Sequence, residues 1–244
     1  MKRLFDIVFS FFGLTVLSPI LIFFMYLVYR QDKKSPFYRA PRVGKNNVIF
    51  KIVKLRSMVI NADKSGVNST SADDSRITPI GYKIRKYKLD EITQLWNVLM
   101  GDMSFVGPRP NTQQDVSLYT KYEKKLLDVR PGITDFSSIV FSDEGSILKD
   151  KEDPDLSYNQ LIRPWKSRLG LIYIDNQSFI LDLQLIFYTA MVAKSKKIAT
   201  NWIVKKLTLL GVNTKVIEIS SRCIALYPYH PPRSKDIAVE IDDR

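Results

Sequence analysis

The sequence predicts a mostly helical α/β protein with a small sheet, in which an N-terminal membrane helix precedes one compact domain. Phe5 to Tyr29 form an almost unbroken apolar run. At ~1.5 Å rise per residue, this run is long enough for a ~30 Å hydrocarbon core. Residues 48–60 alternate between apolar and basic side chains, which is typical of a strand. The 244 residues, 45% of them hydrophobic, also provide one sizeable core.

Basic residues flank the apolar run on both sides: Lys2, Arg3, Arg30, Lys33 and Lys34. The positive-inside bias therefore favours both ends in the cytoplasm, as in a re-entrant helix. Ser18-Pro19 lies near the middle, where proline removes a backbone donor and kinks helices. A signal peptide fits poorly, because the run is too long and has no small-residue cleavage site. From these residues alone, an ordinary spanning helix stays an open alternative.

The remaining segments predict helices, a loop and a tail. Residues 114–129 look helical, and a Pro-Gly pair ends that helix. Residues 178–193 are apolar nearly all round, which favours a buried or membrane-surface helix. Residues 61–78 lack apolar periodicity, so we expect a mobile loop. The expected organisation is a re-entrant membrane helix (1–34), a cytosolic catalytic domain (35–194) and a basic, proline-containing tail (195–244).

The tail leaves two arrangements open. Its apolar residues are interleaved with lysines and predict an amphipathic element that lies on the membrane surface or packs against the domain. Three prolines near its end, Pro228, Pro231 and Pro232, favour an extended or disordered stretch.

Charge and composition narrow the function classes. The net charge of +12 suits a protein on an anionic leaflet, and it also suits a nucleic-acid binder. We see no recognition-helix, zinc or aromatic RNA-binding pattern, so we expect no nucleic-acid partner. Cys223 is the one cysteine, which excludes an intramolecular disulfide and a cysteine metal cluster. His230 is the one histidine and lies in the proline-rich stretch, which turns attention to carboxylates as catalytic groups.

An adjacent acid pair, Asp90 and Glu91, is the most informative feature of the chain. Four cations precede it: Lys83, Arg85, Lys86 and Lys88. Four apolar residues follow at helical spacing and place the pair in the first turn of a helix: Ile92, Leu95, Trp96 and Leu99. Carboxylates beside cations that bind phosphate suggest phosphoryl-type chemistry. The simpler alternative is a helix cap that complements the macrodipole, worth ~0.3–1 kcal/mol.

Short motifs run in one order through residues 1–194. The central ones are Arg85 to Leu89, Asp90-Glu91, Gln94-Leu95, Asn97-Val98-Leu99, Gly101-Asp102-Met103-Ser104 and Val106-Gly107-Pro108-Arg109-Pro110. The others are Lys2-Arg3 with Asp6, Ser18-Pro19, Arg42-Val43-Gly44, Lys54 with Arg56-Ser57-Met58, Arg130-Pro131-Gly132-Ile133-Thr134, and Ser178-Phe179 with Leu181-Asp182-Leu183. Together they resemble the bacterial sugar transferases, which are monotopic phosphoglycosyl transferases.

The resemblance implies transfer of a sugar-1-phosphate from a nucleotide diphosphate sugar, a UDP-sugar, to polyprenol phosphate. This reaction initiates surface glycoconjugate synthesis at the bacterial inner membrane, with the catalytic domain facing the cytoplasm. In such an enzyme Asp90 is the nucleophile that forms a covalent aspartyl-phosphosugar intermediate, and Glu91 helps to hold Mg²⁺. We expect nearby cations to keep Asp90 ionised. A homo-oligomer is compatible with this assignment.

Four basic residues match family positions implicated in the active site and become candidate phosphate contacts: Lys54, Arg56, Arg85 and Arg109. Without the resemblance, each fits a structural role on a strand edge, in a solubilising run or in a turn. Asp182 matches a family carboxylate near the site. A charge in so apolar a helix is costly without a partner, so we expect Asp182 to be a metal ligand.

Departures from the family pattern leave recognition of the sugar and nucleotide open. The departures are Thr93, Ala40, Asp135, Gly170 and the segment 137–148. A catalytically silent membrane scaffold of a glycan assembly complex also stays open, because it would keep the fold without the reaction.

Overall fold

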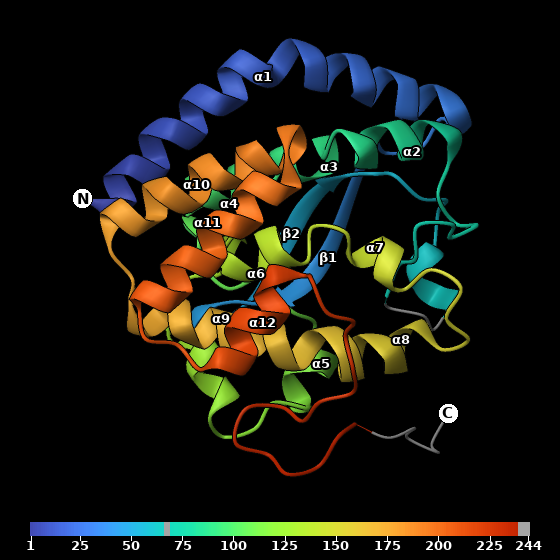
Figure 1. The fold of residues 1–244 in the computed structure, drawn as a ribbon. Coiled ribbons are helices and arrows are strands. Elements are labelled where there is room, and N and C mark those ends of the chain that lie inside the picture. The colour runs from blue at the N-terminus through green and yellow to red at the C-terminus, as the bar shows by residue number, and fades with distance from the viewer. Residues whose placement is uncertain (66–68, 239–244) are drawn as a thin grey trace.

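The computed structural model describes residues 1–65 and 69–238. It is mostly helical with two small sheets and begins with a long apolar helix, which confirms the mostly helical architecture that the sequence predicts (Figure 1). Its longest element is α1 (Lys2–Asp32), which is bent near its middle and packs on α4 (Leu95–Met100) and α2 (Pro79–Lys86). By length and composition α1 could cross a membrane, and most of its large apolar side chains are exposed.

The bend in α1 has a local cause at Ser18-Pro19. Pro19 has no N–H to donate to the carbonyl oxygen of Thr15, one turn earlier. The Ser18 hydroxyl donates to that oxygen instead, at 2.7 Å. The hydroxyl therefore satisfies the acceptor that the proline leaves open, so the helix continues through the break.

Both halves of α1 are tied to the folded domain. Near the N-terminus, Asp6 is only 2% exposed and its carboxylate accepts a hydrogen bond from the backbone N–H of Phe105 at 3.1 Å. At the other end, the guanidinium of Arg56 donates to the Asp32 carboxylate at 2.7 Å. The domain therefore holds the helix at both ends.

The first sheet is an antiparallel hairpin of β1 (Phe37–Val43) and β2 (Ile49–Leu55). The strand predicted within 48–60 is confirmed as β2, although it ends five residues earlier. The strand β1 was not predicted from the sequence. Pro41 and two arginines interrupt the alternation of apolar and polar residues that is typical of a strand. A proline is tolerated there because β1 pairs with β2 alone, which leaves an edge on which no donor is needed. A 3₁₀ turn, η1 (Lys45–Asn47), joins the strands.

The second sheet joins β3 (Ser104–Val106) and β4 (Gly132–Thr134) in parallel. Gly107 follows β3 and Gly132 begins β4, and the backbones of these two glycines lie very close together. A Cβ atom on Gly132 would lie 2.1 Å from the backbone nitrogen of Gly107, so this crossing requires glycine. The crossing lies immediately before Pro108, and it therefore fixes the path of the chain into the Pro-Arg-Pro segment.

The prediction of one continuous helix over residues 114–129 is wrong. The structure has α5 (Gln113–Ser117) and the 3₁₀ helix η3 (Glu123–Leu127) instead. Thr120 and Glu123 explain the division, because each backbone N–H is bonded by the side chain of the other residue. This reciprocal capping starts a new helical segment in the middle of the predicted one.

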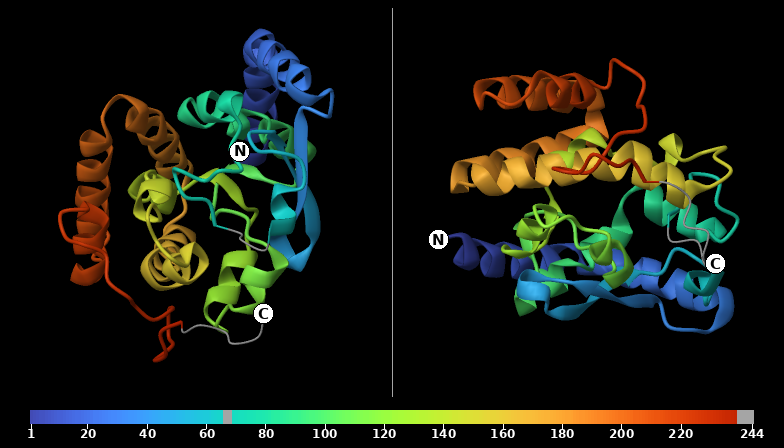
Figure 2. Two further views of the ribbon diagram at one scale, coloured as in Figure 1. Left: turned by 90° about the vertical axis from the view of Figure 1, so that its right-hand side faces the viewer. Right: turned by 90° about the horizontal axis from the view of Figure 1, so that it is seen from below.

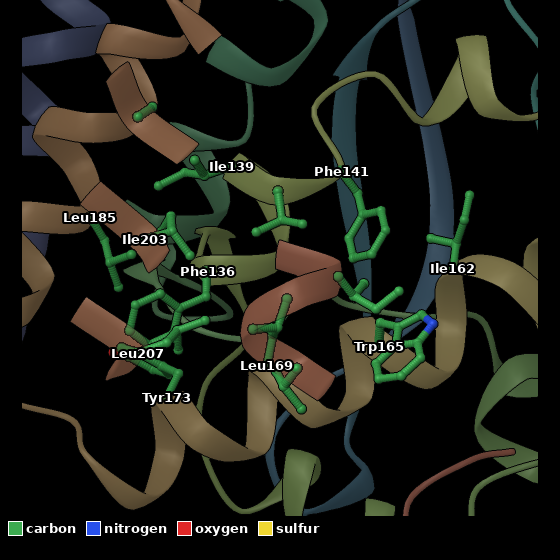
Figure 3. Packing of buried hydrophobic residues seen from close by; sticks show 14 of the residues in the cluster. Phe136, Ile139, Phe141, Ile162, Trp165, Leu169, Tyr173, Leu185, Ile203 and Leu207 are labelled. Carbon is green, nitrogen blue, oxygen red and sulfur yellow. The ribbon is translucent and has the colours of Figure 1, made fainter. Parts of the chain in front are cut away.

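The main core lies among helices from the second half of the chain. It joins α6 (Phe136–Val140), α9 (Arg163–Asp175), α10 (Phe179–Lys194), α11 (Lys196–Leu209) and α12 (Thr214–Ser221). Side chains of α11 interdigitate with those of α6 and α9 (Figure 3). These helices group on one side of the molecule, and the hairpin and α1 lie on the other (Figure 2). The tail therefore packs against the domain, which was one of its two predicted arrangements.

The remaining short elements border the opening between these two sides. They are η2 (Ala62–Ser65), α7 (Glu144–Ile147), α8 (Pro154–Ser157) and the π-helix η4 (Tyr158–Ile162). The loop predicted over 61–78 contains η2 and is closed by a bridge between Met58 and Ile77, while its residues 66–68 lie outside the described part of the chain.

Candidate functional site

A cleft of about 1970 Å³ opens between the hairpin, the acid pair and the α7–α8 region. The residues that line it include all the predicted catalytic and phosphate-binding side chains: Lys54, Arg56, Arg85, Asp90, Glu91 and Arg109. Segments separated by about fifty residues in the sequence thus converge on one site. The cleft is larger than the ~300–1,000 Å³ that holds most small ligands, so it has room for an extended donor.

The acid pair lies in the first turn of α3 (Leu89–Ile92), as predicted. The helix predicted to continue from it is divided into α3 and α4 by Thr93 and Gln94. The Thr93 hydroxyl lies 3.0 Å from two acceptors, the carbonyl oxygens of Val53 and Asp90. Thr93, at which the chain departs from the family pattern, therefore fastens the acid pair to β2.

Asn97 makes a second connection to the same strand. Its side-chain amide donates to the carbonyl oxygen of Lys51 at 2.8 Å and accepts from the N–H of Val53 at 2.9 Å. The Asn97 side chain is only 2% exposed, so these bonds are shielded from water. Together with Thr93, Asn97 fixes the position of Lys54 relative to the carboxylates.

Arg109 is the partner of Glu91. One arm of its guanidinium donates to the Glu91 carboxylate at 2.7 Å, and the other donates to the carbonyl oxygen of Ile133 at 2.6 Å. Burial opposes ionisation of Glu91, but the charges of Arg109 and Lys54 outweigh it and lower the pKa of Glu91 to about 2. Glu91 is therefore ionised at any physiological pH.

Asp90 has the opposite electrostatic balance. Burial raises its pKa above the ordinary value, and the neighbouring negative charge of Glu91 adds to the rise. Lys54, Arg85 and Arg109 act in the other direction without cancelling it. The expectation that nearby cations keep the pKa of Asp90 low is therefore wrong, because desolvation of the buried carboxylate outweighs their charge. Two adjacent carboxylates with pKa values displaced in opposite directions are typical of catalytic sites.

The other predicted cations have additional partners. Burial lowers the pKa of Lys54, and Arg109 adds to this effect. Arg85 donates from Nε to the Ser57 hydroxyl at 2.9 Å. Arg56 is bound by the end of α1, as described above, and therefore connects this long apolar helix directly to the wall of the cleft.

Asp182 is not brought to the acid pair and is not among the residues that line the cleft. Its carboxylate contacts the ammonium of Lys2 at 2.6 Å and accepts a hydrogen bond from the Tyr173 hydroxyl at 2.6 Å. Lys2 also donates to the carbonyl oxygen of Val106 at 2.9 Å. The charge in an apolar helix thus has a partner, as its cost requires, and this partner is a lysine of α1.

Three charged residues of the cleft are not among the site residues predicted from the sequence: Lys88, Arg163 and Lys166. Lys88 adopts a left-handed backbone conformation with φ 52° at the start of α3, and its charge helps to lower the pKa of Glu91. Lys166 and Arg163, both on α9, reach the cleft from the opposite side. Lys166 forms an ion pair with Glu144. Lys88 belongs to the basic run before the acid pair, so its position near the site could have been predicted. No motif in the sequence of α9 indicates that its residues reach the cleft.

Replacement of Arg109 by lysine should lower activity at least about tenfold, or roughly 1.4 kcal/mol of transition-state stabilisation. Lysine keeps the charge, but one ammonium group cannot reproduce the planar fork that joins Glu91 to the Ile133 carbonyl. Steady-state kinetics in membranes would measure the change. Arg233→Lys, an exposed position outside the cleft, is the matched control, and wild-type kinetics for Arg109→Lys would return this arginine to a structural role.

Comparison with known proteins shows the family to which this chain belongs. The family model described as bacterial sugar transferase matches residues 1–196. EpsL of Bacillus subtilis (strain 168), an uncharacterised sugar transferase, is 34% identical over 189 residues, covering 78% of this chain and 85% of that protein. The exopolysaccharide production protein ExoY of Sinorhizobium fredii is 32% identical over 203 residues, covering 77% and 83%. The undecaprenyl-phosphate galactose phosphotransferase of Salmonella typhimurium is 32% identical over 207 residues, covering 79% and 40%.

The fold and the cleft thus define a membrane-associated transferase with an acid pair and a cationic wall. The chain belongs to the bacterial sugar transferase family, and it is an enzyme of that class. The apolar helix α1 fits the membrane anchor of such an enzyme.

Proposed function

We propose that the protein transfers a sugar-1-phosphate from a UDP-sugar to polyprenol phosphate through an aspartyl-phosphosugar intermediate. The observation that carries the proposal is the placement of Asp90 beside the Glu91–Arg109 pair and Lys54 in one large cleft. The printed names of the relatives support the substrate class, since one is an undecaprenyl-phosphate galactose phosphotransferase. The reaction would start surface glycan synthesis at the cytoplasmic face of the bacterial inner membrane.

The reaction proceeds in two displacements at phosphorus. A carboxylate oxygen of Asp90 attacks the β-phosphorus of the donor, the bond from that phosphorus to the bridging oxygen breaks, and a nucleoside monophosphate leaves with the electron pair. A phosphate oxygen of polyprenol phosphate then attacks the phosphorus of the aspartyl phosphate. The acyl phosphate bond breaks, so Asp90 is released as a carboxylate and the lipid carries a diphosphate sugar.

The side chains around Asp90 have separate roles in this scheme. Lys54 and Arg85 face the nucleophile and offer positive charge to the phosphoryl oxygens as negative charge builds on the leaving group. Arg109 holds Glu91 through one arm of its guanidinium and is fixed by the Ile133 carbonyl through the other. The rigid placement of these donors lowers the reorganisation needed during the reaction.

The acid pair also fits Mg²⁺. This ion is usually held by one or two carboxylates together with substrate phosphates, and Glu91 stays ionised beside Asp90. Among the described residues, no group of three or more histidine, cysteine or acidic side chains could hold a metal, so the phosphates of the donor would complete the coordination. Bound there, Mg²⁺ would neutralise charge on the diphosphate. Because Asp182 pairs with Lys2, we assign it to anchoring α1 instead.

We also propose that α1 is re-entrant. The domain contacts both ends of the helix, through Asp6 and Lys2 at one end and Asp32 at the other. A straight spanning helix would separate these ends by the thickness of the bilayer, and one folded domain could not then hold both. The break at Ser18-Pro19 supplies the bend that brings them to the same side.

Cysteine labelling tests this topology. In a Cys223→Ser background, a cysteine inserted between Met1 and Lys2 and, separately, Lys34→Cys should both react only with reagents that enter the cytoplasm. Replacing Ser18 and Pro19 together with alanine restores the missing N–H, so a straight helix should form and the N-terminal label should become accessible from outside. An N-terminal label on the far side in the unmodified helix would refute re-entry and leave the transferase chemistry intact.

The proposed reaction is tested directly by product release. Purified protein in membranes would be supplied with polyprenol phosphate and a panel of nucleotide diphosphate sugars, including UDP-galactose and UDP-N-acetylgalactosamine. We expect one donor to yield nucleoside monophosphate and polyprenol diphosphate sugar in equal amounts. Failure of every donor would favour the catalytically silent scaffold.

A further inference from the structure

The C-terminal segment of residues 227–238, which follows α12, leaves the helical layer (Figure 1). Some of its residues line the cleft. The segment lies outside the region that matches the family, residues 1–196. It has no helix or strand, yet its position is fixed by a series of specific contacts. Its role is therefore a property of this chain and not of the family match.

Aromatic stacking holds the beginning of the segment. The ring of Tyr229 stacks on the buried ring of Trp165, with centroids 4.4 Å apart. The guanidinium of Arg168 lies 4.8 Å from the Tyr229 ring and donates to the carbonyl oxygen of His230 at 2.8 Å. Stacking and a charge-assisted bond together hold this part of the chain against α9.

Gln160 holds the rest of the segment at two points. Its carbonyl oxygen accepts from the N–H of Tyr229 at 3.1 Å, and its side-chain amide donates to the carbonyl oxygen of Ala238 at 2.7 Å. The hydroxyl of Thr120 donates to the carbonyl oxygen of Pro232 at 3.1 Å. Gln160 lies in the π-helix η4, a rare element that is frequent at functional sites.

The held segment forms part of the cleft wall. Pro231, Asp236, Ile237 and Ala238 line the same cleft as the acid pair. The segment lies far from α3, toward the opposite end of the molecule, in both Figure 1 and the left view of Figure 2. One cleft thus extends from the cationic cluster around Asp90, formed by Lys54, Arg85 and Arg109, to this segment.

The charge of the far wall differs from that of the cationic cluster. Asp236 is exposed and lines the cleft, and its carboxylate contacts no side-chain partner among the described residues. A carboxylate repels phosphate, but it is a strong acceptor for hydroxyl groups. Ile237 beside it offers an apolar surface. A nucleotide sugar has both kinds of group, since its diphosphate carries the charge and its two sugar rings carry hydroxyls.

We propose that the segment 227–238 is a donor-specificity wall, in which Asp236 and Ile237 bind a hydroxyl-bearing ring of the nucleotide sugar while its diphosphate lies at the cationic cluster. The ring is either the ribose or the transferred sugar. This inference rests on the proposed function, because it assumes a nucleotide sugar in the cleft. The wall gives this chain a recognition element that family relatives without an equivalent segment lack.

Kinetics of Asp236→Ala and Gln160→Ala test the proposal. The first removes the acceptor, and the second removes the side-chain bond that holds the segment at Ala238, next to Ile237. Both should therefore raise the KM for the donor at least about fivefold, the equivalent of one hydrogen bond. The KM for polyprenol phosphate should not change. Lys235→Ala, next in sequence but outside the cleft lining, is the matched control. Thermal unfolding would verify that each variant keeps the wild-type fold.

Hydrogen exchange on the Asp90→Asn protein gives an independent readout. UDP-galactose and UDP-N-acetylgalactosamine should each slow exchange within residues 229–238 if the transferred sugar is the ring, and UMP alone should do so if it is the ribose. An unchanged donor KM in both variants, or no protection by any of these ligands, would contradict the proposal that this segment binds the donor. A wild-type enzyme that releases no nucleoside monophosphate from any donor would instead overturn the proposed function.

Discussion

Asp90→Asn should abolish turnover, with a loss of at least about a thousandfold, or roughly 4 kcal/mol of transition-state stabilisation. The amide keeps the shape of the side chain but cannot attack phosphorus. It also leaves both contacts of the Thr93 hydroxyl in place, because these are made to the backbone carbonyl oxygens of Val53 and residue 90. The protein should therefore still fold and insert in membranes. Release of nucleoside monophosphate measures the loss.

A labelled donor separates this assignment from general electrostatic roles. Wild-type protein incubated with a donor labelled in its β-phosphate, without polyprenol phosphate, should retain label, and Asp90→Asn should retain none. The exposed residue Asp73 offers the control of the same isosteric change, since Asp73→Asn should behave like the wild type. Near-normal activity of Asp90→Asn would exclude the covalent route.

The pH profile follows from the same pair of carboxylates. Asp90 must be ionised to attack, and burial raises its pKa, so kcat/KM should fall as the pH falls through that raised value. Glu91, with a pKa of about 2, cannot produce this limb because it stays ionised across the range. A rate that rises on acidification would contradict the role of Asp90 as nucleophile.

Glu91→Gln should lose most activity, about a hundredfold or more, which is roughly 2.7 kcal/mol. The change removes the negative charge that faces the Arg109 guanidinium at 2.7 Å and leaves a half-buried cation without its partner. It also removes one of the two carboxylates that fit Mg²⁺. The concentration of Mg²⁺ needed for half-maximal activity should therefore rise sharply.

Titration with Mg²⁺ distinguishes the two effects of Glu91→Gln. If Glu91 is a metal ligand, high Mg²⁺ should recover part of the activity. If Glu91 only orients Arg109, the metal dependence should match that of the wild type while kcat stays low. That second outcome would remove Glu91 from the metal site. Arg109→Lys is the natural companion, because it disturbs the same pair without changing the carboxylate.

Local features of the site were predictable because short-range rules govern them. The first-turn position of Asp90 and Glu91 followed from the spacing of apolar residues. The convergence of Lys54 and Arg109 on that pair did not follow from any periodicity. It depends on the Asn97 side chain, which holds β2, and on the Ile133 carbonyl, which holds Arg109. Only the resemblance to a family suggested it. The raised pKa of Asp90 likewise required knowledge of burial.

Long-range pairings mark where sequence reasoning ended. The partner of Asp182 is 180 residues away, and its apolar helix gave no indication that a lysine of α1 would neutralise the charge. The division of residues 114–129 into two helical segments could have been predicted, because Thr120 and Glu123 have the spacing of a capping box. The packing of α11 was left open because alternating lysines and apolar residues suit a membrane surface and a domain surface equally well.

The two-ended attachment of α1 imposes an order of events during synthesis. Val106 and Asp182, which hold Lys2, are translated 104 and 180 residues after it. The contacts of Lys2 therefore cannot form until both of these residues have been made. Such distant pairings form slowly, because a long loop must close before they contribute stability. The attachment of α1 at both ends is thus complete only when α10 has been translated, so in a nascent chain arrested before that point Asp182 cannot yet hold Lys2.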